Sequence, residues 1–174
     1  MSITLVLGGA RSGKSGFAEG IAKKSNQAVV YIATAQIRDK AIAERVGLHQ
    51  QSRPVDWLTV ECPLALGAAL DRYAISGATV LVDCLTMWVT NILCEEDAKE
   101  KTALEQRLFF AALDKLKGDV IFVSNEVGMG IIPMGELTRD YVDIAGRLHQ
   151  DIAASADNVM LIVAGLPLVL KGSA

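Results

Sequence analysis

The run Gly8-Gly9-Ala10-Arg11-Ser12-Gly13-Lys14-Ser15 fits the pattern GxxxxGK[ST]. It follows the apolar run Ile3 to Leu7 and leads into a segment of helical period. In such a strand–loop–helix unit the glycines let backbone N–H groups turn inward on phosphate oxygens, and the helix N-terminus adds its positive end. Lys14 is expected to reach the β- and γ-phosphates, and Ser15 to hold Mg²⁺. The stretch predicts a site for a nucleoside triphosphate, rather than a plain connecting turn.

The rest of the chain alternates short apolar runs with segments of helical period, which is typical of a parallel sheet wrapped by helices. Six strands are predicted, at Ile3 to Leu7, Val29 to Ala33, Trp57 to Glu61, Thr79 to Asp83, Val120 to Ser124 and Val159 to Val163. Helices are predicted at Ser15 to Lys24, Ala41 to Gln50, Leu64 to Ala74, Thr102 to Lys115 and Leu137 to Ser155, with an exposed connection at Glu95 to Lys101. The pattern predicts an α/β, RecA-like P-loop NTPase, with a mostly parallel sheet and helices on both faces.

Length and charge narrow the class of protein further. A chain of 174 residues with 51% hydrophobic content suffices for one core, so residues 1–174 are predicted to form a single domain. The net charge of -3 gives no concentrated positive field for nucleic acid or an anionic membrane. The start has no basic region, and its apolar run meets glycines after Leu7, so we expect no signal peptide and a cytoplasmic protein.

An acidic residue completes the predicted magnesium site. Asp83 ends the strand-like run Thr79 to Val82, where a P-loop enzyme needs a second carboxylate. The alternative is a strand-end Asp that caps the next segment.

The two histidines have different surroundings. His149 lies in a helical segment with one apolar face and is interpreted as structural. His49 lies near the end of a polar helix that Pro54 must terminate. A neutral imidazole can attack phosphorus and form a covalent intermediate, and Arg53 could neutralise the phosphate charge. An exposed histidine without a role is the alternative interpretation of His49.

Several blocks together resemble the bifunctional adenosylcobinamide kinase/adenosylcobinamide-phosphate guanylyltransferase family, over nearly the full chain. The blocks are Gly8 to Ser15, Tyr31-Ile32-Ala33-Thr34-Ala35-Gln36, His49 through Arg53-Pro54, Ser124 to Pro133, and Asp143 to Gln150. A generic P-loop kinase would share the first block only.

The resemblance implies two transfers: the γ-phosphate of ATP or GTP goes to the aminopropanol hydroxyl of adenosylcobinamide, and GMP from GTP then goes to that phosphate through a guanylylated histidine. His49 matches this nucleophile, although some relatives have two adjacent histidines where this chain has Leu48-His49. It also implies a small homo-oligomer, a trimer or dimer. The matches to GTP contacts are Gly8, Gly9, Ala10, Arg11, Ser12, Gly13, Lys14, Ser15, Ala33, Thr34, Ala35, Gln50, Gln51, Ser52, Arg53, Glu61 and Asp83.

Three points stay open at this stage. Asn125 and Glu126, followed by two glycines within four residues, are candidates for binding substrate or accepting its proton, or else belong to a rigid turn. The chain could also be a P-loop kinase of another small alcohol or nucleotide, with His49 idle. A nucleotide-dependent regulatory subunit is the third possibility, because the P-loop fold hosts all three classes.

Overall fold

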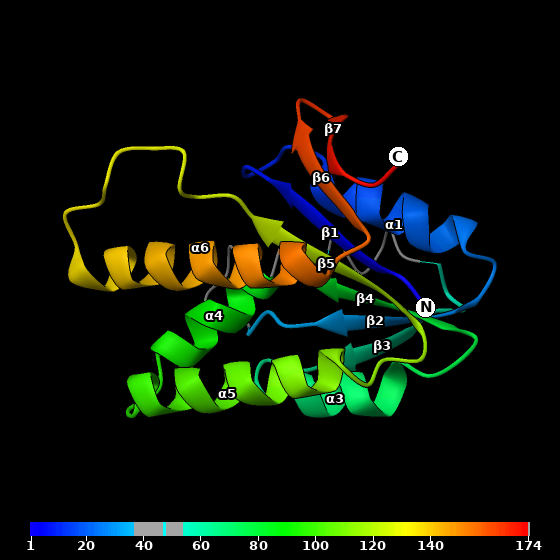
Figure 1. Cartoon of the computed structure of the whole chain (residues 1–174), viewed down its shortest axis with the longest axis horizontal. Helices are drawn as coiled ribbons and strands as arrows, with labels where there is room; N and C mark the ends of the chain where they lie inside the picture. The colour runs from blue at the N-terminus through cyan, green and yellow to red at the C-terminus, as the bar shows by residue number, and fades with distance from the viewer. Residues whose placement is uncertain (37–46, 48–53, 174) are drawn as a thin grey trace.

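The computed structural model describes residues 1–36, 47 and 54–173, and within these residues seven strands form one sheet (Figure 1). The order across the sheet is β3-β2-β4-β5-β1-β6-β7. The strands are β1 (Ile3–Gly8), β2 (Ala28–Ala33), β3 (Leu58–Glu61), β4 (Ala78–Asp83), β5 (Asp119–Asn125), β6 (Asn158–Val163) and β7 (Leu166–Lys171).

All pairings from β3 to β6 are parallel, which confirms the predicted mostly parallel sheet. The central strands are buried on both faces, so their sequences read as continuous apolar runs. Parallel strands also bring their carboxyl ends to one edge, where β1 and β5 end side by side with Gly8 opposite Asn125.

The prediction of six strands was wrong, because β7 adds a seventh that pairs antiparallel to β6. Pro167 lies within this strand, and proline is tolerated there because β7 lies at the edge of the sheet. The two strands are joined by Ala164 and Gly165, with φ of 52° and 80°. Two left-handed residues form the tight turn that suits a β-hairpin.

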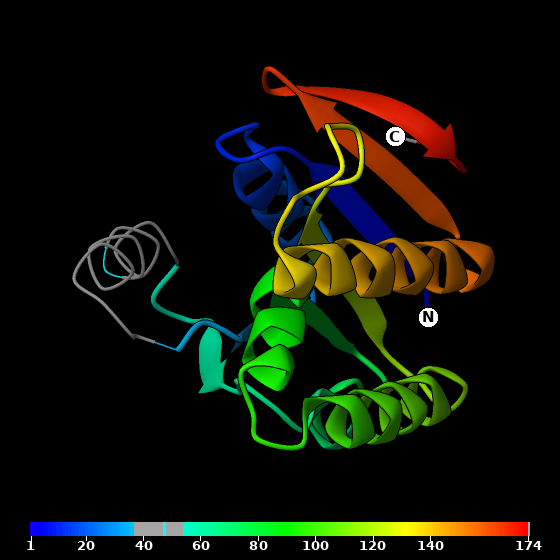
Figure 2. The same cartoon turned by 90° about the vertical axis from the view of Figure 1, so that its left-hand side faces the viewer.

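Helices cover both faces of the sheet, as predicted (Figure 2). They are α1 (Lys14–Lys24) on one face, and α3 (Leu66–Tyr73), α4 (Leu85–Leu93), α5 (Ala98–Leu113) and α6 (Glu136–Ser155) on the other. None of these described helices combines the length and apolarity needed to cross a membrane.

Two helix predictions need correction, and a third falls outside the described residues. The sequence analysis missed α4, although its buried residues Leu85, Trp88, Val89 and Ile92 recur at helical spacing. Helix α5 begins at Ala98, so it includes the end of the predicted connection at 95–101. The helix predicted at 41–50 lies outside the described residues, except for Gly47.

The larger core lies under α3, α4, α5 and α6 and centres on three fully buried aromatic rings. The Phe109 ring lies 5.3 Å from that of Trp88 and 5.4 Å from that of Phe122. Both distances are within the range of favourable aromatic pairs. The rings join α4 and α5 to β5, and so fix the layer behind the strand ends.

We predict that Gly67→Ala destabilises the protein by about 1–3 kcal/mol, because helices α3 and α5 touch at their backbones. A Cβ at position 67 would lie 2.6 Å from the Leu108 carbonyl oxygen and 2.9 Å from the Phe109 nitrogen. Gly20→Ala is the matched control in α1, where an added Cβ meets open space, and it should stabilise by about 0.5–1 kcal/mol. Urea unfolding measures both; effects of the same sign would contradict this account.

Candidate functional site

The phosphate loop has the predicted strand–loop–helix setting, since it joins β1 to α1. Gly13 caps the helix with φ 96°, a left-handed conformation that favours glycine. The Ser12 nitrogen donates to the Gly9 carbonyl at 3.2 Å, and the Lys14 ammonium donates to the same carbonyl at 3.4 Å. The lysine side chain therefore folds back over the loop, where a bound phosphate chain would meet it.

The turn of the β6–β7 hairpin braces this loop from outside. The Gly165 nitrogen donates to the Ser12 carbonyl at 2.8 Å. A Cβ on Gly13 would lie 3.3 Å from the Gly165 Cα, so the two backbones are in close contact. The last strand pair of the chain thus helps to set the shape of the first motif.

Asp83 lies at the end of β4, at the same edge of the sheet as the loop. Its Oδ2 accepts a hydrogen bond from the Tyr31 hydroxyl at 2.9 Å. Burial, and after it the Asp83 charge, raise the pKa of the neighbouring Cys84 thiol to about 11, while the Lys14 charge opposes that shift. The charges of Lys14 and Asp83 therefore both act on the Cys84 thiol.

A buried polar cluster ties the ends of β2 and β4 together. The Thr34 hydroxyl donates to the Cys84 carbonyl at 2.7 Å and accepts from the Cys84 nitrogen at 2.8 Å. The Asn91 amide of α4 donates to the Thr34 carbonyl at 2.8 Å and to the Pro63 carbonyl at 3.0 Å. Because Thr34 is fully buried, its side chain holds these strand ends in place.

Asn125 and Glu126 stand directly beside the phosphate loop. The Glu126 nitrogen donates to the Gly8 carbonyl at 3.0 Å, and the Asn125 nitrogen donates to the Thr86 hydroxyl at 2.8 Å. The Glu126 carboxylate accepts from the nitrogens of Gly128, at 2.7 Å, and Met129, at 3.3 Å. Glu126 therefore shapes the chain that follows β5.

The His149 side chain packs beneath these residues and is hydrogen-bonded to Ser124, the residue before Asn125. Its Nε2 lies 2.7 Å from the Ser124 hydroxyl, which in turn lies 3.4 Å from the Thr86 hydroxyl. Burial lowers the pKa of His149 below its ordinary 6.5, while the Glu126 charge opposes that shift. The neutral ring accepts from Ser124 or donates to it, depending on its tautomer. This fits the structural interpretation and places that role at the site.

The buried oxygens without a hydrogen-bond partner among the described residues include Ser12 Oγ and Asn125 Oδ1. Both belong to segments that meet at Gly8, since a Cβ there would lie 2.5 Å from Ser12 Oγ and Asn125 pairs with Gly8. Buried polar atoms without partners are costly, so such atoms often mark where a ligand binds.

The other predicted site residues divide into two sets. Ala33 and Glu61 lie opposite each other at the ends of β2 and β3, and Ala35 follows Thr34, half-buried. His49, Gln50, Gln51, Ser52 and Arg53 lie outside the described residues. The structure thus brings together the P-loop, Asp83 and Asn125, while the predicted nucleophile stays a prediction.

Sequence reasoning assigned no role to Tyr31, Thr86 or Ser124, although Tyr31 and Thr86 bond to predicted site residues and Ser124 links Thr86 to His149. Tyr31 alone gave a signal, as the aromatic residue of an otherwise aliphatic run that ends at the ligand edge. Thr86 lies in helix α4, which the sequence analysis did not predict, so nothing in the sequence analysis pointed to this residue.

Comparison with known proteins identifies the family and the fold. The family described as cobinamide kinase / cobinamide phosphate guanyltransferase matches residues 4–170. A bifunctional adenosylcobalamin biosynthesis protein CobP of Pseudomonas aeruginosa is 50% identical over 97% of this chain and 96% of its own length. A bifunctional adenosylcobalamin biosynthesis protein CobU of Escherichia coli is 41% identical over 96% of this chain and 98% of its own. Among solved structures, the RadB recombinase has a TM-score of 0.51 at 16% identity, covering 92% of this chain and 73% of that one, which supports the P-loop fold alone.

We predict that His149 makes stability depend on pH. Because its pKa is lower in the folded state than the ordinary 6.5, the unfolded chain binds the proton more readily. The contribution of His149 to the free energy of unfolding should therefore be fully present above about pH 6.5. It should be lost as the pH falls from there through the lowered pKa of the folded state. Urea unfolding between about pH 8 and 5 measures this.

His149→Gln is the control, because a glutamine amide can still bond to Ser124 without titrating. The variant should lose part of the slope that the wild type shows over this range. Parallel stability curves for the two proteins would show that His149 does not carry the effect.

Proposed function

The chain belongs to the cobinamide kinase / cobinamide phosphate guanyltransferase family, and from that premise we propose that it carries out both transfers on one P-loop site, the second through a guanylylated His49. It is a transferase of adenosylcobalamin biosynthesis. The observation that carries the proposal is the family match over residues 4–170, together with a phosphate loop that lies at the same edge of the sheet as Asp83.

In the proposed kinase step, the substrate hydroxyl oxygen attacks the γ-phosphorus and the bond to the β-phosphate oxygen breaks. Lys14 neutralises charge that spreads over the transferred group. Asn125 Oδ1, which lacks a partner among the described residues, accepts a hydrogen bond from the substrate hydroxyl and orients it. The proton of that hydroxyl passes to solvent or to the Glu126 carboxylate, which also accepts hydrogen bonds from two backbone nitrogens.

Mg²⁺ fits the residues at this edge, because a hydroxyl and a carboxylate are the oxygen ligands that it prefers. Ser15, in the first turn of α1, and Asp83 would hold it with the nucleotide. Asp83 is positioned for this by Tyr31, whose hydroxyl binds one carboxylate oxygen. The ion would neutralise negative charge on the phosphates.

In the proposed guanylyl transfer, an unprotonated nitrogen of His49 attacks the α-phosphorus of GTP and pyrophosphate leaves. A phosphate oxygen of the phosphorylated substrate then attacks the same phosphorus, and the phosphorus–nitrogen bond breaks. The support is the sequence block from His49 to Arg53. GTP rather than ATP is the proposed nucleotide for this step, with the ends of β2 and β3, at Ala33, Ala35 and Glu61, near the base.

We predict that the wild type incubated with α-labelled GTP acquires stable label on the protein, and that His49→Ala acquires none. Phosphoryl transfer from γ-labelled GTP to cobinamide should persist in His49→Ala, because the two steps use different attacking atoms. Denaturing gels and chromatography of the labelled acceptor measure the two reactions.

The same experiment separates the alternatives. If γ-label reaches an added acceptor and no α-label stays on the wild-type protein, the result would favour a simple kinase with an idle His49. Release of phosphate without labelled protein or labelled cobinamide would favour a regulatory nucleotide-binding subunit.

We further predict that Lys14→Met lowers kcat for phosphoryl transfer by about 100- to 1,000-fold, because it removes a preorganised charge from the transferred phosphate. Lys24→Met is the matched control, since this lysine is exposed at the far end of the same helix. Steady-state kinetics with cobinamide measures both variants. Equal losses in the two would contradict the assignment of Lys14.

A further inference from the structure

The connection between β5 and α6 exposes a cluster of large apolar side chains, and we call residues 127–135 the apolar loop. Within it Ile131 is 97% exposed, Met134 95%, Ile132 79% and Met129 77%. Aliphatic side chains scattered over a surface are ordinary, but contiguous ones mark a binding surface. In Figure 1 the apolar loop extends from the end of β5, at the edge where β1 ends.

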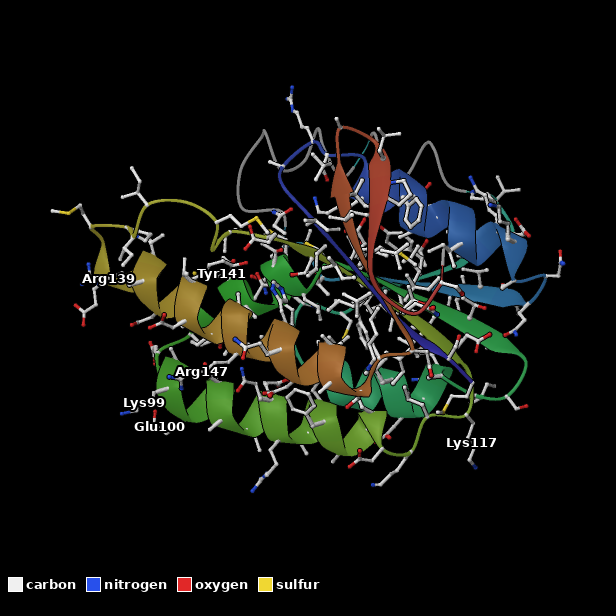
Figure 3. The ribbon with its side chains drawn as sticks, turned by 45° about the horizontal axis from the view of Figure 1, so that its top comes forward. Lys99, Glu100, Lys117, Arg139, Tyr141 and Arg147 are labelled. Carbon is white, nitrogen blue, oxygen red and sulfur yellow. The ribbon has the colours of Figure 1, made fainter. Side chains whose placement is uncertain are left out.

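Hydrogen bonds hold the apolar loop at both ends. At its start, the Glu126 carboxylate binds the nitrogens of Gly128 and Met129. At its far end, the Arg139 guanidinium donates to the carbonyls of Pro133 and Met134. Figure 3 shows Arg139 at the end of α6 that the loop enters. The exposed side chains therefore lie on a braced segment, and do not pack against the sheet.

The place of the apolar loop restricts what can cover it. Its first residues adjoin the phosphate loop, since the Glu126 nitrogen bonds to the Gly8 carbonyl at 3.0 Å. On the proposed function, the substrate hydroxyl must reach the γ-phosphate, and a short aminopropanol arm joins that hydroxyl to the corrin ring. The distance from the ring to Asn125 and to this loop is then limited by the length of the aminopropanol arm.

We propose that the apolar loop binds the corrin macrocycle of the substrate, an inference that rests on the proposed function. The methyl-bearing rim of the ring packs on Ile131, Ile132 and Met134, and Asn125 receives the hydroxyl arm. Unbranched methionine side chains with polarisable sulfur fit the uneven surface of such a ring. The nucleotide is held by the P-loop, so the two ligands meet at Gly8 and Asn125.

The test compares Ile131→Ser/Ile132→Ser with the wild type by equilibrium dialysis against cobinamide, followed by its visible absorbance. Loss of the two proposed isoleucine contacts with the ring should weaken cobinamide binding by about tenfold or more. GTP binding and the unfolding temperature should not change, because both side chains are exposed and contribute little to packing of the fold. Leu168→Ser, at a 55% exposed position on β7, is the matched control and should bind cobinamide like the wild type.

Each outcome decides the matter. Unchanged cobinamide affinity in the double variant, or a changed oligomeric state on gel filtration with unchanged affinity, would overturn the proposal and assign the loop to contact between copies. If the double variant misfolds, Met134→Gln replaces it with the same expected loss. A wild type that neither binds nor phosphorylates cobinamide would overturn the proposed function itself, and this inference with it.

Discussion

The close approach of bare backbone around Gly8 is the constraint on which the site depends. Any Cβ there would lie 2.5 Å from Ser12 Oγ and 2.7 Å from the Ile162 carbonyl oxygen. The phosphate loop can curl tightly only because β1 ends without a side chain and β6 runs directly beside it. The hairpin turn at Gly165 adds a second backbone contact to Ser12. Strands that come last in the sequence are thus part of the support for the first motif.

Around this point, buried hydrogen bonds fix the carboxyl ends of the neighbouring strands. Thr34, Asn91 and Ser124 are polar residues with almost no exposed surface, and each is hydrogen-bonded to another strand end or helix. Leaving such a group unpaired costs about 1–3 kcal/mol, so the arrangement in which they are paired is strongly preferred. These bonds position Asp83 and Asn125 from behind, which leaves their remaining oxygens for ligands.

Sequence patterns predicted the strands that are buried on both faces and the loop that carries a distinctive glycine spacing. Strands such as Val120 to Ser124 are continuous apolar runs because both faces are covered, and the glycines of the P-loop have spacing that few other motifs share. Helix α4 was missed although Leu85, Trp88, Val89 and Ile92 recur at helical spacing, since it is only nine residues long and begins directly after Cys84 at the end of β4. Strand β7 escaped because Pro167 is compatible only with an edge, and edge position is a property of the assembled sheet. The bond from His149 to Ser124 joins residues that are 25 positions apart, and no local pattern encodes it.

The topology gives a physical reason why one triphosphate site can support two reactions. The acceptor hydroxyl and His49 must attack different phosphorus atoms, so they need different directions of approach. In the sheet, β5 lies next to β1, whereas β2 and β3 lie beyond β4 on the far side of β5. On the proposed mechanism the acceptor comes over Asn125 at the end of β5, and His49 comes from the connection between β2 and β3. The triphosphate can stay fixed on the P-loop while the attacking group changes, so the binding energy of the phosphates serves both transfers.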